Sequence, residues 1–445
     1  MRRSYANPMT SDTRRVWLTT LGCAKNQVDS DKLSAILADA GYATADSPDD
    51  ADVVMVNTCA FIEAAREESV DTIIELENAK RDDAKLVVLG CMAQRFGVEV
   101  EEAFPAADAV LGLDRYGELV GTLDRLTNWQ PVRLLRSPMD ILYEVRRPTL
   151  TTPYAYVKVA EGCDKPCTFC AIPLIRGKQR SRPPVNIRQE VEELAADGAR
   201  EIVLVAQDLA AYGRDIDAPG GIEDLLRFVS DIEGVQWFRL LYLYPREIRP
   251  ALIAEMTSNP RIAPYFDLSL QHASRHLLRA MKRPGDGDRF LELIGDIRSG
   301  NPQAATRSSF IVGFPGETEA DVEELAEFLE TAGLDWAGFF PYSAEEGTPA
   351  ADLPGRLPND VVGERLRYLQ SLQEEITAER NAAMVGRTLE VLVDGVEDGR
   401  PYGRSYREAP EIDGVIEFDH GKPGDLVDVL IDASYGSELA GTVVE

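Results

Sequence analysis

The cysteines are the side chains of this sequence best suited to chemistry. All six fall into two groups of three. One group forms a tight Cys-x3-Cys-x2-Cys loop made of Cys163, Cys167 and Cys170. The other group is Cys23, Cys59 and Cys91, with separations of 36 and 32 residues. No export signal accompanies them, so the pattern favours thiolate ligands of metal over a disulfide framework.

Each group has one thiolate too few for a closed iron-sulfur cubane. A 4Fe-4S cluster has four irons, each of which takes one external ligand, and cysteine thiolate is the usual donor. Three cysteines leave one iron open, and an open iron binds a reactant where a closed cluster only relays electrons. If each group holds its own cubane, the sequence predicts chemistry with two small ligands.

The tight loop matches the radical-SAM signature, with the aromatic Phe169 directly before its last cysteine. Structural zinc is the main alternative, but zinc requires a fourth protein ligand. No further cysteine is near, and the three histidines lie more than 100 residues away in sequence: His272, His276 and His420. The ligand count therefore favours a cluster.

The spread cysteines each end a short apolar stretch, at 16–23, 51–59 and 85–91. These stretches predict buried strands, and the intervening segments 30–40 and 60–78 have helical patterns. Strand, helix and strand in this order form the unit of a parallel sheet. The cysteines would then share the carboxyl edge of the sheet, where such folds bind ligands. Three separate buried structural cysteines are the alternative, and their common position argues against it.

A second series of strands predicts a partial (β/α)6 barrel. The expected strands are 154–160, 201–206, 237–243, 266–270, 307–312 and 336–341. Helical patterns separate them, at 187–197, 222–232, 275–281 and 319–332. In such barrels the chemistry takes place on loops at the carboxyl ends of the strands.

Polar residues and glycines follow several of these predicted strands. Gln207 and Asp208 end the second strand, and Gln271 and His272 end the fourth. The fifth runs into the loop 313–317, where glycines permit close approach of the backbone to a ligand. Taken singly, His272 could be a structural histidine and the glycine loop only a turn. Their shared location favours a binding site.

Four cations follow the cysteine loop directly: Arg176, Lys178, Arg180 and Arg182. Such a run is commonly a solvated face. A functional alternative is that these side chains bind a carboxylate, a phosphate or the negative cluster.

The final 65 residues predict a small five-stranded β-barrel. Short strands are expected at 389–393, 414–418, 426–431 and 441–444, between turns rich in Gly, Pro and Asp. This segment contains 14 acidic and 5 basic residues, a net charge of −9, and the whole chain carries −29. Both values disfavour binding to a phosphate backbone. No signal peptide or membrane-spanning run is recognisable, so we expect a cytoplasmic location.

These elements predict an α/β chain with four segments. We expect an amino-terminal parallel-sheet α/β domain with an auxiliary cluster at 14–130 and a linker at 131–148. The radical-SAM core is expected at 149–380 and the small OB-like barrel at 381–445.

Four motifs make the chain similar to the radical-SAM methylthiotransferases along nearly its whole length. They lie at 21–30 (LGCAKNQVDS), 206–215 (AQDLAAYGRD), 270–274 (LQHAS) and 310–318 (FIVGFPGET). Within this family the sequence most resembles the RimO type, which modifies an aspartate of small-subunit ribosomal protein twelve. Ser269 departs from the pattern, since relatives often have proline there, and we expect little consequence.

The resemblance implies two 4Fe-4S clusters and S-adenosyl-L-methionine (SAM) as cofactors, and a carboxy-terminal TRAM domain. SAM would be cleaved at the cluster of the tight loop, and the resulting radical would take a hydrogen from the aspartate β-carbon, which no ordinary base can do. Sulfur would come from the cluster of the spread cysteines, and a second SAM would supply the methyl group. The residues that match family regions around SAM are Phe169, Gln207, Asp208, Gly313, Gly316 and Glu317. The implied partners are the ribosomal protein, a reductant such as flavodoxin or ferredoxin, and a sulfur donor.

Two other functions remain open from the sequence. The same chemistry could methylthiolate a tRNA adenosine next to the anticodon, although the acidic final domain disfavours tRNA. A non-enzymatic iron-sulfur electron carrier is the second alternative, although it would need clusters closed by four cysteines. The sulfur source, the reductant and the oligomeric state are not indicated by the sequence.

Overall fold

The computed structural model describes residues 13–127, 141–216, 218 and 220–444. The chain divides into two compact units between Pro148 and Thr149. Most of the predicted linker, 131–140, lies outside the described residues. Among those that are described, no helix is both long enough and apolar enough to span a membrane.

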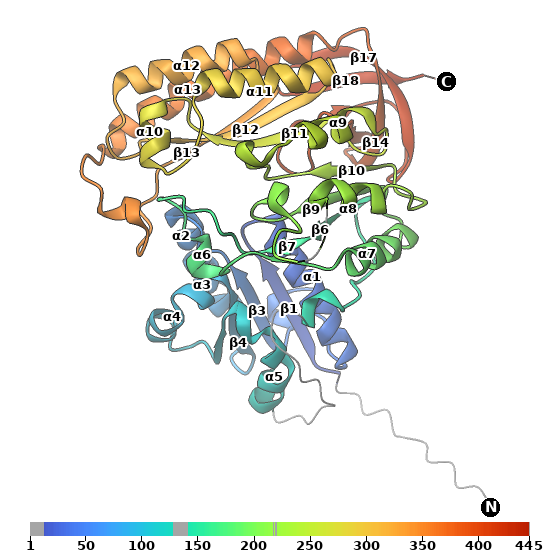
Figure 1. Cartoon of the computed structure of the whole chain (residues 1–445). Helices are drawn as coiled ribbons and strands as arrows, with labels where there is room; N and C mark the ends of the chain where they lie inside the picture. Colours follow the sequence, from blue (N-terminus) through green and yellow to red (C-terminus); the bar gives the residue numbers. More distant parts are fainter. Residues whose placement is uncertain (1–12, 128–140, 217, 219, 445) are drawn as a thin grey trace, which may run out of the picture. The chain divides into compact units, whose positions relative to one another are not determined.

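The first unit is a parallel five-stranded sheet with the strand order β2-β1-β3-β4-β5 (Figure 1). Its strands are β1 Arg15–Thr20, β2 Ala43–Thr44, β3 Val53–Thr58, β4 Lys85–Gly90 and β5 Ala109–Leu111. Its helices are α1 Ala24–Asp39, α2 Glu63–Ala79, α3 Cys91–Arg95, α4 Gly97–Ala103 and α5 Leu119–Thr127. β3 and β4 are almost wholly buried and rich in Val and Leu, as is typical of central parallel strands.

Helix α1 starts earlier than the predicted 30–40. Cys23 has an extended backbone and precedes the first turn, and its carbonyl accepts the N–H groups of Asn26 and Gln27 at 2.8 and 3.2 Å. The start of this helix could not be recognised from the sequence, because its buried positions are polar where an amphipathic helix has apolar residues. Lys25, Asn26, Asp29 and Ser30 are all buried.

The second unit contains the six predicted strands of the partial barrel. They are β6 Tyr154–Lys158, β9 Glu201–Val205, β10 Trp237–Leu240, β11 Tyr265–Gln271, β12 Ala305–Val312 and β13 Trp336–Pro341. The parallel pairs are β6 with β9, β9 with β10, β11 with β12, and β12 with β13. A parallel bridge between Leu243 and Leu268 links the two halves. The strands therefore follow one another in chain order, as in a partial barrel.

Helices cover the outside of this barrel. Four match the predicted helical segments: α7 Pro184–Ala196, α8 Gly221–Val229, α10 Arg275–Ala280 and α12 Glu319–Ala332. Three others were not predicted: α9 Pro250–Ser258, α11 Gly287–Gly300 and α13 Asn359–Ala382. In Figure 1, α11, α12 and α13 lie together over one side of β12 and β13.

The last segment is a closed barrel with the order β14-β15-β16-β18-β17. Its strands are β14 Thr388–Glu397, β15 Arg400–Arg404, β16 Ile416–Glu417, β17 Leu426–Tyr435 and β18 Glu438–Val443. The sequence did not predict β15, because its Arg-Pro-Tyr-Gly-Arg composition is typical of a turn. The five-stranded barrel itself is confirmed.

Buried ion pairs join this small barrel to the amino ends of the larger barrel's strands. Glu201 accepts from Arg239 at 2.5 Å and from Arg404 at 2.6 Å, and all three side chains are buried. Asp413 accepts from the Tyr265 hydroxyl at 2.6 Å. The two barrels therefore share a polar core.

Candidate functional site

The tight cysteine loop follows β6 and β7 (Ala160–Glu161) at the carboxyl end of the first barrel strand. Gly162 turns the chain with a φ of +79°, and a Cβ at this position would lie 2.2 Å from the carbonyl oxygen of Lys178. The N–H of Cys163 donates to the carbonyl of Gly177 at 3.1 Å. Thr168 donates through its N–H to Met281 and through its hydroxyl to Ala280, at 3.1 and 2.9 Å. These bonds fix the loop at both ends.

Hydrogen-bond donors lie beside two of the three sulfur atoms of this loop. The N–H of Lys165 lies 3.5 Å from Cys163 Sγ, and Nη1 of Arg283 lies 3.6 Å from Cys167 Sγ. Burial raises the pKa of Cys163 to about 11 and that of Cys170 to about 12. Iron must therefore displace protons when it binds.

The donor set of the loop fits a cubane. Hydrogen bonds to sulfur are among the means by which proteins adjust such clusters. Among the described residues, no group of three or more Cys, His, Asp or Glu side chains is placed to hold a single metal ion. A cubane takes each thiolate on a different iron.

The cation run after the loop has mixed roles. Arg176 is buried and pairs with Glu161 at 2.5 Å, and Arg182 is buried and pairs with Glu190 at 2.6 Å. Lys178 and Arg180 are exposed. Half of the run is therefore structural, and it does not form one cationic surface.

Glu161 connects the cysteine loop to the second barrel strand. Burial would raise the pKa of this carboxyl, but Arg176 and Lys158 outweigh burial and lower it. Its Oε1 also accepts from Nε2 of Gln207 at 3.2 Å. This bond holds the Gln207 side chain against Glu161, just before the cysteine loop.

Asp208 is the most conspicuous polar group at the strand ends. Its side chain is buried, with 2% of the residue exposed, and neither carboxylate oxygen has a well-formed hydrogen bond among the described residues. Nζ of Lys165 lies 3.2 Å from it and also pairs with Glu247 at 2.5 Å. Burial outweighs Lys165 and raises the pKa of Asp208. A buried carboxylate with open acceptor positions is suited to ligand hydroxyl groups.

The glycine loop after β12 is braced by Glu317. Gly313 and Gly316 have φ values of +81° and +87°. Glu317 accepts from the N–H of Gly313 at 2.9 Å and from Arg365 at 2.8 Å, and His272 Nε2 lies 3.7 Å away. The Glu317 carboxylate therefore holds the loop in shape from inside.

His272 is completely buried, and its Nδ1 accepts the N–H groups of Ala273 and Ser274, both at 3.0 Å. This favours the structural interpretation of His272. Phe169 packs against the apolar core of the barrel.

The three spread cysteines lie at strand ends in the first unit. Cys23 precedes α1, Cys59 follows β3, and Cys91 begins α3 after β4. Asn26 joins these loops. Its Nδ2 donates to the carbonyls of Leu21 and Thr58 at 2.9 and 3.1 Å, and its Oδ1 lies 3.6 Å from Cys91 Sγ. In the sequence Asn26 appears only as part of the motif at 21–30. Its contacts with three loops could not be predicted, because no periodic pattern indicates them.

A glycine with positive φ directly precedes three of the six cysteines. Gly22 and Gly90 precede Cys23 and Cys91 in the first unit, and Gly162 precedes Cys163 in the tight loop, with φ values of +89°, +95° and +79°. Such a φ lets the chain turn directly at the end of a strand. Gly90 is the most confined in the first unit, because a Cβ there would lie 2.3 Å from Asn57 Oδ1 and 2.6 Å from the carbonyl of Thr58.

We expect Gly90→Ala to displace Cys91 and abolish binding of the first-unit cluster. Strained backbone and steric overlap together should destabilise this unit by about 2–4 kcal/mol. Iron analysis should show half the wild-type content. Gly97→Ala is the matched control, since a Cβ there meets nothing within 4 Å. Full iron content in Gly90→Ala would show that the turn is dispensable.

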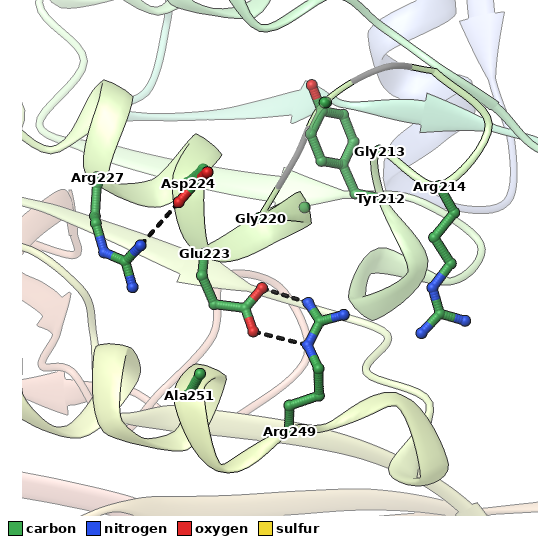
Figure 2. Close-up of a pocket in the computed structure, with 11 residues that line it drawn as sticks. Tyr212, Gly213, Arg214, Gly220, Glu223, Asp224, Arg227, Arg249 and Ala251 are labelled. Atoms are coloured by element: carbon green, nitrogen blue, oxygen red, sulfur yellow. Dashed lines mark hydrogen bonds and ion pairs between the residues drawn. The ribbon is translucent and has the colours of Figure 1, made fainter.

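A cavity of about 470 Å³ lies elsewhere in the second unit, beside the start of α8 (Figure 2). Four of its five charged groups form pairs within the cavity lining, and the fifth, Arg214, pairs with Glu247. Glu223 binds Arg249 through both oxygens, and Asp224 binds Arg227 at 2.8 Å. None of the predicted cofactor residues is among those that line it. The predicted site is therefore separate from this cavity.

Comparison with protein families gives three matches. A model described as uncharacterized protein family UPF0004 matches residues 15–112. The radical SAM superfamily matches residues 157–329, and the TRAM domain matches residues 385–444.

Several similar curated proteins carry the name ribosomal protein uS12 methylthiotransferase RimO. The protein from Kineococcus radiotolerans is 41% identical, over 97% of this chain and 98% of its own length. The protein from Moorella thermoacetica is 44% identical, over 95% of this chain and 97% of its own. Among solved structures, the radical S-adenosylmethionine methyltransferase TsrM from Kitasatospora setae, with cobalamin and a [4Fe-4S] cluster bound, has a TM-score of 0.53 at 14% identity. The match covers 85% of this chain and 81% of that one, and shows a shared fold.

Proposed function

The chain belongs to the RimO family of radical-SAM methylthiotransferases, and we propose that it adds a methylthio group to the β-carbon of an aspartate of ribosomal protein uS12. Identity of 41–44% over nearly the full length of its relatives supports this function. The observation that carries it is the pair of cysteine triplets, each at the carboxyl edge of its own parallel sheet. Two open clusters suit a reaction that needs both a radical source and a sulfur source.

The cofactors are SAM and 4Fe-4S clusters. We propose that Cys163, Cys167 and Cys170 hold the cluster at which SAM binds, and that Cys23, Cys59 and Cys91 hold the auxiliary cluster. When bound, the first cluster and SAM supply one-electron cleavage and the means to remove hydrogen from an unactivated carbon.

The protein's own residues position these groups. Asp208 offers free acceptor positions to ligand hydroxyls, Lys165 holds that carboxylate in place, and Gln207 is held by Glu161. Gly313 and Gly316 let backbone approach the ligand, with Glu317 fixing the loop between them. Phe169 supports the cysteine loop from the core.

Replacing Gln207 and Asp208 together with Ala should weaken SAM binding or uncouple SAM cleavage. Iron content should stay at the wild-type level, because neither side chain is a thiolate ligand. Loss of two polar contacts to a buried ligand predicts a decrease in affinity of about tenfold or more. Equilibrium dialysis with SAM measures this. Unaltered affinity and cleavage would show that both residues are structural.

The small barrel is the proposed contact for uS12. Arg404 and Arg407 are buried in ion pairs. Side chains of acids in the barrel are buried as well, among them those of Asp394 and Glu408, so its surface keeps the acidic excess of its composition. A basic ribosomal protein would be attracted by such a surface and tRNA repelled. Among the acids of this barrel, Asp413 is unsuitable for docking, because its side chain is 1% exposed and pairs with Arg307. Glu417 stays a candidate.

The function is tested by incubating reduced, reconstituted protein with SAM and uS12, followed by mass analysis of peptides. We expect one aspartyl peptide to gain a methylthio group. Cleavage of SAM without any modified peptide would contradict the proposal. A low-potential electron donor such as flavodoxin or ferredoxin, a sulfur donor and a cytoplasmic location belong to the same proposal.

A further inference from the structure

Arg283 is a buried cation directed at the tight cysteine loop. It follows α10, and only 8% of the residue is exposed. Its Nη1 lies 3.6 Å from Cys167 Sγ, and its Nη2 donates to the carbonyl of Ser269. The guanidinium carbon lies 4.0 Å from the centre of the Tyr244 ring.

The charge of Arg283 has no carboxylate partner within 4 Å in the part of the chain that the structure describes. Lys165 offers a contrast. It lies over the same Tyr244 ring at 4.7 Å, but Asp208 and Glu247 neutralise it. A buried charge is stable only when an opposite charge or strong hydrogen bonds compensate it. The nearest group that can become negative beside Arg283 is the Cys167 thiol.

The backbone around Arg283 keeps this contact in place. The N–H of Arg283 donates to the carbonyl of Leu278 at 2.7 Å. The preceding residues, Ala280 and Met281, accept the two hydrogen bonds from Thr168 in the cysteine loop. The cysteine loop and the segment that carries Arg283 are therefore hydrogen-bonded to each other, which keeps the guanidinium group beside the Cys167 thiol.

We propose that Arg283 is the counter-ion of the cluster held by Cys163, Cys167 and Cys170, and that it raises the reduction potential of this cluster. The inference rests on the proposed function, because it assumes a cluster at these thiols. Three thiolates make the cluster negative, and reduction adds one electron and no proton. A fixed positive charge and an N–H···S bond stabilise the more negative, reduced state. Arg283 would thus ease the electron transfer on which SAM cleavage depends.

The test is a redox titration of the full chain carrying Cys59→Ala, without SAM, with dithionite as the electron source and electron paramagnetic resonance as the readout. This background should hold about four iron per chain, all at the tight loop. Adding Arg283→Gln should lower the ratio of reduced to oxidised cluster, at a fixed potential, at least tenfold. For one electron this is about 59 mV in the midpoint. Arg283→Lys, which keeps the charge, should change the ratio less than threefold.

Arg279→Gln is the matched control, since it removes the same charge from an exposed position of α10. It should leave the ratio unchanged. An unchanged midpoint in Arg283→Gln would overturn the inference, and weaker SAM binding in that case would identify Arg283 as a ligand of SAM. An equal decrease in Arg283→Lys, or loss of iron from both variants, would show a structural role instead. Absence of a cluster from the Cys59→Ala background would contradict the proposed ligands, independently of Arg283.

Discussion

Cys167→Ala should remove one cluster and abolish SAM cleavage, whereas Cys59→Ala should remove the other cluster and leave SAM cleavage intact. The two cysteines lie in separate compact units, each within a triplet of its own. Removing one of three thiolates leaves a cubane with two protein ligands, which is too few to retain it. Anaerobic reconstitution of the wild type should give about eight iron per chain, and each variant about four.

Methylthiolation should be lost in both variants, because each cluster is needed for a different part of the reaction. The readouts are iron content, formation of 5′-deoxyadenosine and product mass. Circular dichroism of both variants controls for folding. Loss of both clusters from a single substitution, or zinc bound at the tight loop, would show that the assignment of two independent clusters is wrong.

The second large effect concerns stability, at the ion pairs between the two barrels. Glu201 is fully buried and holds both Arg239 and Arg404. Glu201→Gln would leave these guanidinium groups without a shared carboxylate, and breaking a buried pair in this way typically costs about 3–5 kcal/mol. Arg404 keeps Asp394 at 2.6 Å, so we expect a loss near the lower end, about 3 kcal/mol.

The pH dependence of stability should change in the same variant. Burial would raise the pKa of Glu201, but the two arginines outweigh it and lower the pKa below its ordinary value of 4.5. The stabilisation is therefore complete above about pH 4.5 and is lost as the pH falls through the lowered folded-state pKa. Glu201→Gln should lack this acid-dependent component.

Urea unfolding of the second unit, followed from pH 3 to pH 7, measures both effects. Glu397→Gln, at an exposed end of β14, is the control and should stay within about 0.5 kcal/mol of wild type. Equal stability of Glu201→Gln and wild type would mean that the buried pairs contribute nothing to the junction of the barrels.

Much of the fold could be predicted from the sequence because its strands are short apolar runs ending in cysteine, Gly or polar residues. The six strands of the larger barrel and the closed small barrel were predicted in this way. Helix α13 was missed because charged and other polar residues occupy more than half of its length. The short strand β15 was missed because its Pro and Gly are typical of turns.

Only those residues of the candidate site that directly follow a predicted strand could be identified from the sequence. Within the larger barrel, the tight cysteine loop, Gln207 and Asp208 all follow apolar runs, so their position at the carboxyl ends of its strands was foreseeable. The contact of Arg283 with Cys167 spans 116 residues of sequence, and nothing in either local pattern indicates it. The burial of Asp413 is likewise not indicated by the sequence, because its partners Tyr265 and Arg307 belong to distant strands.

The central claim is the substrate, and a competition measures it most directly. Reduced, reconstituted enzyme with SAM is offered uS12 and isopentenylated tRNA together, and both are digested and weighed. We expect a methylthio group on an aspartyl peptide of uS12 and unmodified tRNA, because specificity lies in the docking surface rather than in the shared chemistry. Methylthiolated adenosine with untouched uS12 would contradict the account.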